Sequence, residues 1–208
     1  MGLRGIFDPE NGFFRTLSRM VDVVGLSLLW VGLSLPLVTF GPACAALYHT
    51  VRQGDSTYLT FFRSFRANLR VGIPAGLLVL AAGALLLQGY QIMVLAANFV
   101  GGGALAMYGC YCAALIVPAG VSCWAFPLLS RFQMGLGHLL VTSFQVTLRH
   151  LPQTLLLILL LFVTVWTTAG FFPLAVFTPA LNALLASMPA ERVIRRYLPE
   201  KEPEGEEL

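Results

Sequence analysis

Asp22 is the acidic residue nearest the interior of a long apolar segment, so it is the first candidate for chemistry. An acid within such a segment is costly to bury and is typical of a proton or cation ligand. Arg19 lies three residues earlier on the same helical face, where the two side chains can pair one turn from a membrane interface. We expect the Arg19–Asp22 pair to anchor the helix.

Histidines and cysteines do not form a recognisable reactive or metal-binding set. The three histidines, which have no serine, cysteine or acid at a catalytic spacing, are His49, His138 and His150. The four cysteines, which all lie in apolar segments where cysteine behaves as a small hydrophobe, are Cys44, Cys110, Cys112 and Cys123. Phosphate-binding, dinucleotide-binding and zinc motifs are absent from the sequence. We therefore expect no enzyme activity, no catalytic residue, no cofactor and no metal site.

Uncharged polar residues within the apolar segments have two interpretations. Gln88 and Gln91 lie one helical turn apart, and Asn182 lies in a later segment. Side chains of this kind either line a path for a solute or hold helices together by interhelical hydrogen bonds. The sequence leaves both alternatives open.

Arginines mark two amphipathic stretches, 55–70 and 131–150, each directly before an apolar run. The arginines of interest there are Arg63, Arg66, Arg70 and Arg149. Helices with this pattern lie in the headgroup region, where their arginines fix the topology and attract anionic lipid. The alternative is that they dock a cytoplasmic protein partner.

Long charge-free runs determine what the remaining elements must be. No charged residue or histidine occurs in 71–130 or in 151–190, and only 11% of the 208 residues are charged. Such runs must face hydrocarbon or one another, so the chain is predicted to be a polytopic membrane protein whose partner is the lipid bilayer. A net charge of +3 is too small to indicate nucleic-acid binding. We expect one membrane domain over 1–198, and a disordered tail over 199–208 with five glutamates.

The expected fold is all-α, a helix bundle with about five membrane segments and additional amphipathic interfacial helices. The predicted membrane segments are about 21–39, 71–93, 104–129, 151–169 and 172–188, and the interfacial helices are 8–20, 55–70 and 131–150. The arginine-rich borders are separated by even numbers of segments, which places them and the C-terminus in the cytoplasm. Arg15 and Arg19 break this pattern. Either the N-terminus lies outside, or residues 21–51 enter the membrane and return as a broken hairpin around Pro36 and Pro42.

A seven-residue pattern, S-F-x-x-x-L-R, occurs at 64–70 and again 79 positions later at 143–149. Each copy directly precedes an apolar segment. The pattern favours a parallel internal duplication of an interfacial helix followed by two membrane segments. Independent use of phenylalanine and arginine as interface anchors is the alternative.

Three stretches of the chain resemble the YesL family of bacterial integral membrane proteins, which carry a domain of unknown function. They are GIFDPENGFFRTLSRMVDVVGLSLLW, LSLPLVTFGPACAALYHTV and SFRANLR, and FGPACAALY is the most specific part. The resemblance implies a bacterial plasma membrane location and genes placed beside ABC-type sugar importers and polysaccharide-degrading enzymes. Together with the arginine-bearing helices, it favours an accessory or regulatory component of carbohydrate uptake that binds importer subunits. The alternatives are a small solute carrier or channel, and a structural envelope protein.

Overall fold

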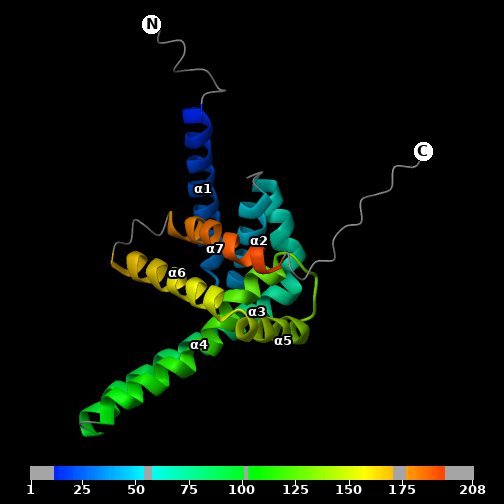
Figure 1. Ribbon diagram of the computed structural model, residues 1–208. Helices are drawn as coiled ribbons and strands as arrows, with labels where there is room; N and C mark the ends of the chain where they lie inside the picture. Colours follow the sequence, from blue (N-terminus) through cyan, green and yellow to red (C-terminus); the bar gives the residue numbers. More distant parts are fainter. Residues whose placement is uncertain (1–11, 54–57, 101–102, 171–176, 195–208) are drawn as a thin grey trace, which may run out of the picture.

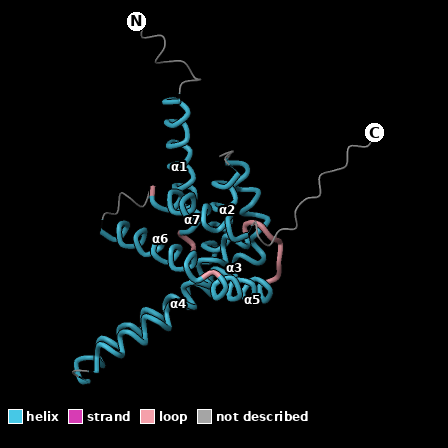
Figure 2. Tube along the Cα trace, viewed as in Figure 1, coloured by secondary structure: helices cyan, strands magenta, loops and turns pink. Residues whose placement is uncertain are grey.

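Every regular element of the described residues is a helix in the computed structural model (Figures 1 and 2). The structure describes residues 12–53, 58–100, 103–170 and 177–194. The elements are α1 (Gly12–Ser34), the 3-10 helix η2 (Leu37–Thr39), α2 (Phe40–Gln53), α3 (Tyr58–Val100), α4 (Ala104–Leu129), α5 (Leu136–Arg149), α6 (Leu151–Gly170) and α7 (Thr178–Ile194). The predicted all-α fold is confirmed. The acidic tail predicted over 199–208 lies outside the described residues.

Three helices are long and apolar enough to cross a membrane, and they are Tyr58–Ala96, Leu105–Leu129 and Leu151–Gly170. Their apolar side chains are largely exposed; Trp166, for example, is 72% exposed on α6. Apolar surface on this scale is typical of helices that face lipid. The apolar part of α1 (Val21–Ser34) is shorter, and the 17 residues of α7 include Glu191 and Arg192. The predicted count of five membrane segments is therefore supported for three of them.

Two predicted interfacial helices are continuous with the membrane segments that follow them, contrary to expectation. The helix predicted at 55–70 and the segment at 71–93 form the single helix α3, and α1 joins the described part of 8–20 to the next segment in the same way. No glycine or proline interrupts residues 58–71, and Pro74 is accommodated inside α3. At ~1.5 Å per residue the 43 residues of α3 span about 65 Å, twice the ~30 Å hydrocarbon core. Only α5 remains a separate helix, since the chain leaves helical geometry at His150.

The α1 and α2 helices form an antiparallel hairpin, which is compatible with the second of the two N-terminal alternatives. The indole Nε1 of Trp30 in α1 donates to Sγ of Cys44 in α2 at 3.4 Å, and Leu26 and Leu47 belong to one buried cluster. The turn between the helices contains Pro36, and the hydroxyl of Thr39 donates to the Pro36 carbonyl at 2.8 Å. At ~1.5 Å per residue the 14 residues of α2 are about 21 Å long, too short to cross a ~30 Å core.

Glycines allow α2 to approach α3 at backbone distance. A Cβ on Gly41 would collide with the carbonyl oxygen of Gly72 and with the backbone of Gly76. Close approach of this kind is the usual role of small residues where membrane helices pack. The first turn of α2 is therefore in backbone contact with α3, and this contact holds the hairpin against α3.

The C-terminal half of α4 packs against α5 and α6 through a polar contact in an otherwise apolar core. Trp124 is fully buried, and its Nε1 donates to Oγ1 of Thr154 in α6 at 2.9 Å. Gly120 lies against Thr147 of α5 and Thr154, and a Cβ there would collide with the methyl groups of both. In the other direction, α3 and α4 pair as an arm that extends away from the remaining helices (Figure 1). Within this arm the hydroxyl of Tyr111 donates to the carbonyl of Leu86.

Candidate functional site

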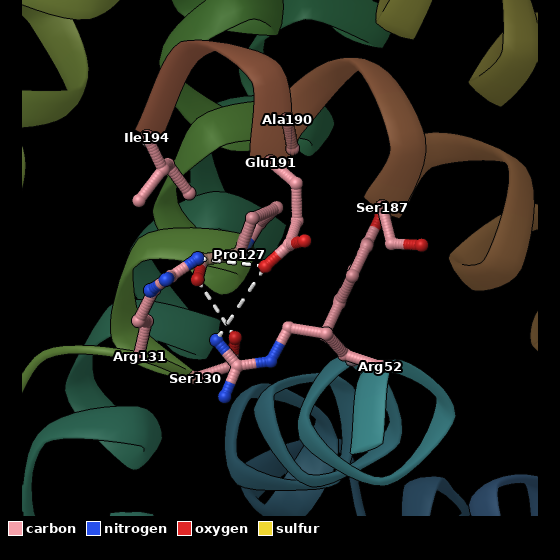
Figure 3. Close-up of a pocket in the computed structure, with 9 residues that line it drawn as sticks. Arg52, Pro127, Ser130, Arg131, Ser187, Ala190, Glu191 and Ile194 are labelled. Atoms are coloured by element: carbon pink, nitrogen blue, oxygen red, sulfur yellow. Dashed lines mark hydrogen bonds and ion pairs between the residues drawn. The ribbon is translucent and has the colours of Figure 1, made fainter. Parts of the chain in front are cut away.

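Three charged side chains meet where α2, α4 and α7 end, and we call them the charged junction: Arg52, Arg131 and Glu191 (Figure 3). Arg131 Nη1 donates to Oε1 of Glu191 at 2.7 Å, and Arg52 Nη1 lies 4.0 Å from the same oxygen. The exposed fractions of the three side chains are 25%, 20% and 26%. The junction is thus partly buried, where ionic contacts are screened less than on an open surface.

Two guanidinium groups face one carboxylate, so the charged junction carries a formal excess of positive charge. Partial burial and repulsion from Arg131 lower the pKa of the Arg52 guanidinium, and the Glu191 carboxylate opposes that shift. Arginines are favourable near helix C-termini, whereas a carboxylate such as Glu191 in the last turn of α7 is not. The two arginines offset the unfavourable interaction between the Glu191 carboxylate and the C-terminal end of the α7 dipole. His49 adds a neighbouring link between helices, since its Nδ1 lies 3.1 Å from the Ser130 carbonyl oxygen.

Two cavities adjoin at Tyr48. A small pocket of about 20 Å³ lies at the charged junction and is lined by Tyr48, Ser187 and Ile194 in addition to the charged side chains. A larger cavity of about 650 Å³ lies between α1, α2, α3, α4, α6 and α7, and Tyr48 lines it as well. Most residues lining the larger cavity, such as Phe126, are apolar. The charged junction therefore adjoins a partly open apolar cavity, and Tyr48 lies between them.

Asn182 and the two glutamines, which the sequence suggested for a solute path or for helix association, lie in different places. Asn182 lines the larger cavity, and its Nδ2 donates to the Thr164 hydroxyl at 2.5 Å and to the Leu160 carbonyl at 3.3 Å. It therefore holds α6 to α7 and also faces the cavity. Gln88 and Gln91 are exposed on the α3 part of the arm and are not among the residues that line the cavity. The structure does not bring the three side chains together.

The arginines proposed for docking are exposed. Arg63, Arg66 and Arg70 follow one another along the first turns of α3, and the buried Phe61 and Ser64 occupy the other side of these turns. Arg149 is also exposed and lines a separate groove of about 280 Å³ between α5 and the end of α7. The groove has apolar walls that include Leu128, Val146 and Ile194. These arginines are accessible to a partner or to lipid headgroups.

The predicted Arg19–Asp22 pair is only partly described. Asp22 is half-buried on α1, and the side chain of Arg19 lies outside the described residues. All four cysteines are free thiols; Cys44 is buried in the α1–α2 hairpin, whereas Cys110 and Cys112 are exposed on α4. The cysteines thus form no disulfide.

Sequence reasoning missed the charged junction. It considered the arginine-rich borders only as markers of topology and did not single out Arg52, Arg131 or Glu191. One signal was available, since Arg52 and Arg131 are 79 positions apart, the same offset that relates Ser64 to Ser143. No signal in the sequence indicated that Glu191 meets both arginines, because that contact depends on how α7 folds back.

Comparison with protein families matched residues 23–90 to a family described as a protein of unknown function, DUF624. The match includes the second half of α1, the whole of α2 and α3 as far as Tyr90. It covers less than half of the chain. No curated protein and no solved structure matched the sequence.

Proposed function

We propose that this chain is an accessory component of a bacterial carbohydrate import system, and that it docks an acidic surface of an importer subunit on the inner face of the membrane. The docking residues are Arg63, Arg66, Arg70 and Arg149. The observation that carries the proposal is the exposure of all four arginines, while Phe61 and Ser64 on α3 and Ser143 and Val146 on α5 are buried. Arginine is suited to this role because its planar fork binds carboxylates with two hydrogen bonds.

The link to carbohydrate import rests on the resemblance to the YesL family. The DUF624 match over residues 23–90 is compatible with that resemblance and includes three of the four docking arginines. We accordingly propose a location in the bacterial plasma membrane, with the arginines and the C-terminus on the cytoplasmic side. The antiparallel α1–α2 hairpin supports this orientation, because it returns the chain to the side on which α1 begins.

An internal duplication gives the docking arginines related positions. Beyond the S-F-x-x-x-L-R pattern, identical residues recur at the 79-position offset as Gly41 and Gly120, Cys44 and Cys123, Ala46 and Ala125, and Arg52 and Arg131. Gly41 and Gly120 are both closely packed against a neighbouring helix, and Ser64 and Ser143 are both buried. We therefore propose that α2 and the start of α3 correspond to the end of α4 and α5. In this arrangement Arg70 and Arg149 are equivalent docking positions.

Co-purification from native membranes tests the docking proposal. The full chain should enrich a subunit of a sugar importer, and replacing the four docking arginines with glutamine should abolish the enrichment. Arg192→Gln is the matched control, because Arg192 is also exposed on an arginine-bearing helix end but is not a docking residue. If no importer subunit is enriched, or if the control loses the partner equally, the proposal fails.

A second candidate function, a small solute carrier, is favoured by the cavity of about 650 Å³ beside Asn182. Flux of a labelled sugar into proteoliposomes that contain only this protein would support it. Asn182→Leu should then abolish the flux, whereas Gln91→Leu, on the exposed arm, should leave it unchanged. Absence of flux with the purified protein would leave the accessory role as the better account.

A further inference from the structure

Three helices run from the apolar cavity to the charged junction. Along α2 the side chains of Cys44, Tyr48 and Arg52 follow at intervals of four residues, so they share one face of the helix. Cys44 lines the apolar cavity, Arg52 lines the small pocket, and Tyr48 lines both. The same order occurs on α4, where Phe126 lines the cavity and Arg131, just beyond the helix, lines the pocket. Apolar and charged surfaces are therefore arranged along one continuous direction.

On α7 the change from apolar to charged occurs within a few residues. Ala183 and Ala186 line the apolar cavity, and Ala190 and Glu191 line the small pocket. The cavity is lined by residues from all three candidate membrane spans, α3, α4 and α6, whereas the charged junction lies at the helix ends. In a bilayer this order places the cavity at hydrocarbon depth and the arginines near the headgroups. The arrangement matches the structure of an amphiphile that has one anionic end.

The contacts of Glu191 indicate what kind of anion suits the arginines. Its Oε1 is 2.7 Å from Arg131 but 4.0 Å from Arg52, beyond hydrogen-bond distance. One carboxylate oxygen thus stands between the two guanidinium groups and engages one of them closely. A phosphate group offers three acceptor oxygens and can engage two arginine forks at once.

We propose that Arg52 and Arg131 bind the phosphate of an anionic amphiphile whose hydrocarbon chain occupies the 650 Å³ cavity, and that Glu191 holds the phosphate position when no amphiphile is bound. The volume is within the range of about 300–1,000 Å³ that is typical of ligand sites. Binding displaces the Glu191 carboxylate from Arg131, and Tyr48 lies where the headgroup meets the chain. This site does not include the docking arginines, so the proposal does not depend on the proposed import role.

Quenching of tryptophan fluorescence measures binding, because Trp30 lines the cavity, whereas the fully buried Trp124 does not line it and contributes a constant background. The full chain carrying Trp166→Phe is placed in nanodiscs of zwitterionic lipid, since Trp166 is exposed and would report lipid outside the cavity. Phosphatidic acid and phosphatidylcholine with the same brominated chains are then compared at equal mole fraction. We expect phosphatidic acid to quench Trp30 at a concentration about tenfold lower, as one charge-assisted interaction provides.

Substitutions at the charged junction separate ligand binding from a structural role. Arg131→Gln and Arg52→Gln should each remove the preference for phosphatidic acid. Glu191→Gln should instead raise the apparent affinity for it by about threefold, because the competing carboxylate is gone. If the junction were only a structural ion pair, Glu191→Gln would weaken binding or leave it unchanged. The control is Arg192→Gln, an exposed arginine beside Glu191, which should keep the wild-type preference.

Several outcomes would overturn the proposal. Equal quenching by the two lipids would show that the charged junction does not select a headgroup. If the arginine variants kept the preference for phosphatidic acid, the arginines would not bind its phosphate. If Glu191→Gln did not raise the affinity, Glu191 would not occupy the phosphate position. Inorganic phosphate is added as a separate arm. If millimolar phosphate abolishes the preference as effectively as excess unbrominated phosphatidic acid, the site binds free phosphate and the amphiphile assignment is wrong.

Discussion

Replacing Gly41 with alanine should destabilise the protein, because α2 meets α3 at backbone distance there. The added Cβ would collide with the carbonyl oxygen of Gly72 and lie 2.8 Å from the backbone nitrogen of Gly76. Backbone atoms cannot rotate away as a flexible side chain can, so the two helices must separate. Overpacking of this kind costs about 1–3 kcal/mol. Alanine also improves helix propensity by up to about 1 kcal/mol, so the net loss is smaller than the collision alone implies.

Gly83→Ala is the matched control for this prediction. Gly83 lies within α3, and a Cβ there would meet no atom of another helix within 4 Å. Gly83→Ala lies in a helix interior and gains the full helix propensity, whereas Gly41 lies in the first turn of α2 and gains less, so the collision of about 1–3 kcal/mol should place Gly41→Ala well below Gly83→Ala. Thermal unfolding of the purified proteins in one detergent, followed by circular dichroism, measures the difference. If Gly41→Ala unfolds at or above the temperature of Gly83→Ala, the close α2–α3 packing described above is incorrect.

Three further substitutions test individual hydrogen bonds by the same unfolding measurement. Trp124→Phe removes the buried bond to Thr154 and should cost about 1–3 kcal/mol, since the Thr154 hydroxyl loses its donor; an unchanged midpoint would contradict that bond. Tyr111→Phe removes the bond to the Leu86 carbonyl within the arm and should cost about 1 kcal/mol, whereas Tyr90→Phe, which is exposed on the same arm, should cost nothing measurable. Thr39→Val removes the contacts that close the α1–α2 turn, and it should cost about 1 kcal/mol while Thr39→Ser retains stability.

Helical content and the three candidate membrane spans followed directly from composition. The runs 71–130 and 151–190 contain no charge, and a segment of that composition has few stable structures other than a helix in lipid. The exposure of Arg63, Arg66 and Arg70 also followed from spacing, because residues at these intervals share a helical face. These features depend on local sequence alone.

The prediction of separate helices over 55–70 and 71–93 was wrong, because α3 is continuous, and the reason is physical. A change from an amphipathic pattern to a uniformly apolar one was interpreted as a change of helix direction at Arg70 and Val71. Backbone hydrogen bonding does not depend on whether the side chains are amphipathic or uniformly apolar, since it requires only that no residue break the helix. Leaving helical geometry at His150 produced the expected break between α5 and α6, but no comparable break follows Arg70.

The α1–α2 hairpin and the charged junction depend on tertiary contacts that single segments do not encode. Counting arginines left two alternatives for residues 21–51, and it could not predict the contact between Trp30 and Cys44 that joins α1 to α2. Glu191 meets Arg52 and Arg131 only because α7 returns to the ends of α2 and α4. The separation of Gln91 from Asn182 has the same origin, as it depends on the direction in which the α3–α4 arm extends.

Cysteine labelling of whole cells tests the central claim, which is that the arginine-bearing helix ends share the inner face of a membrane. Single cysteines at Arg66, Arg149 and Gln53 in a cysteine-free background should react with a membrane-impermeant maleimide only after permeabilisation. A cysteine at Gly103, in the turn between α3 and α4, should react in intact cells. Labelling of Arg66 or Arg149 from outside, or protection of Gly103 in intact cells, would contradict the account.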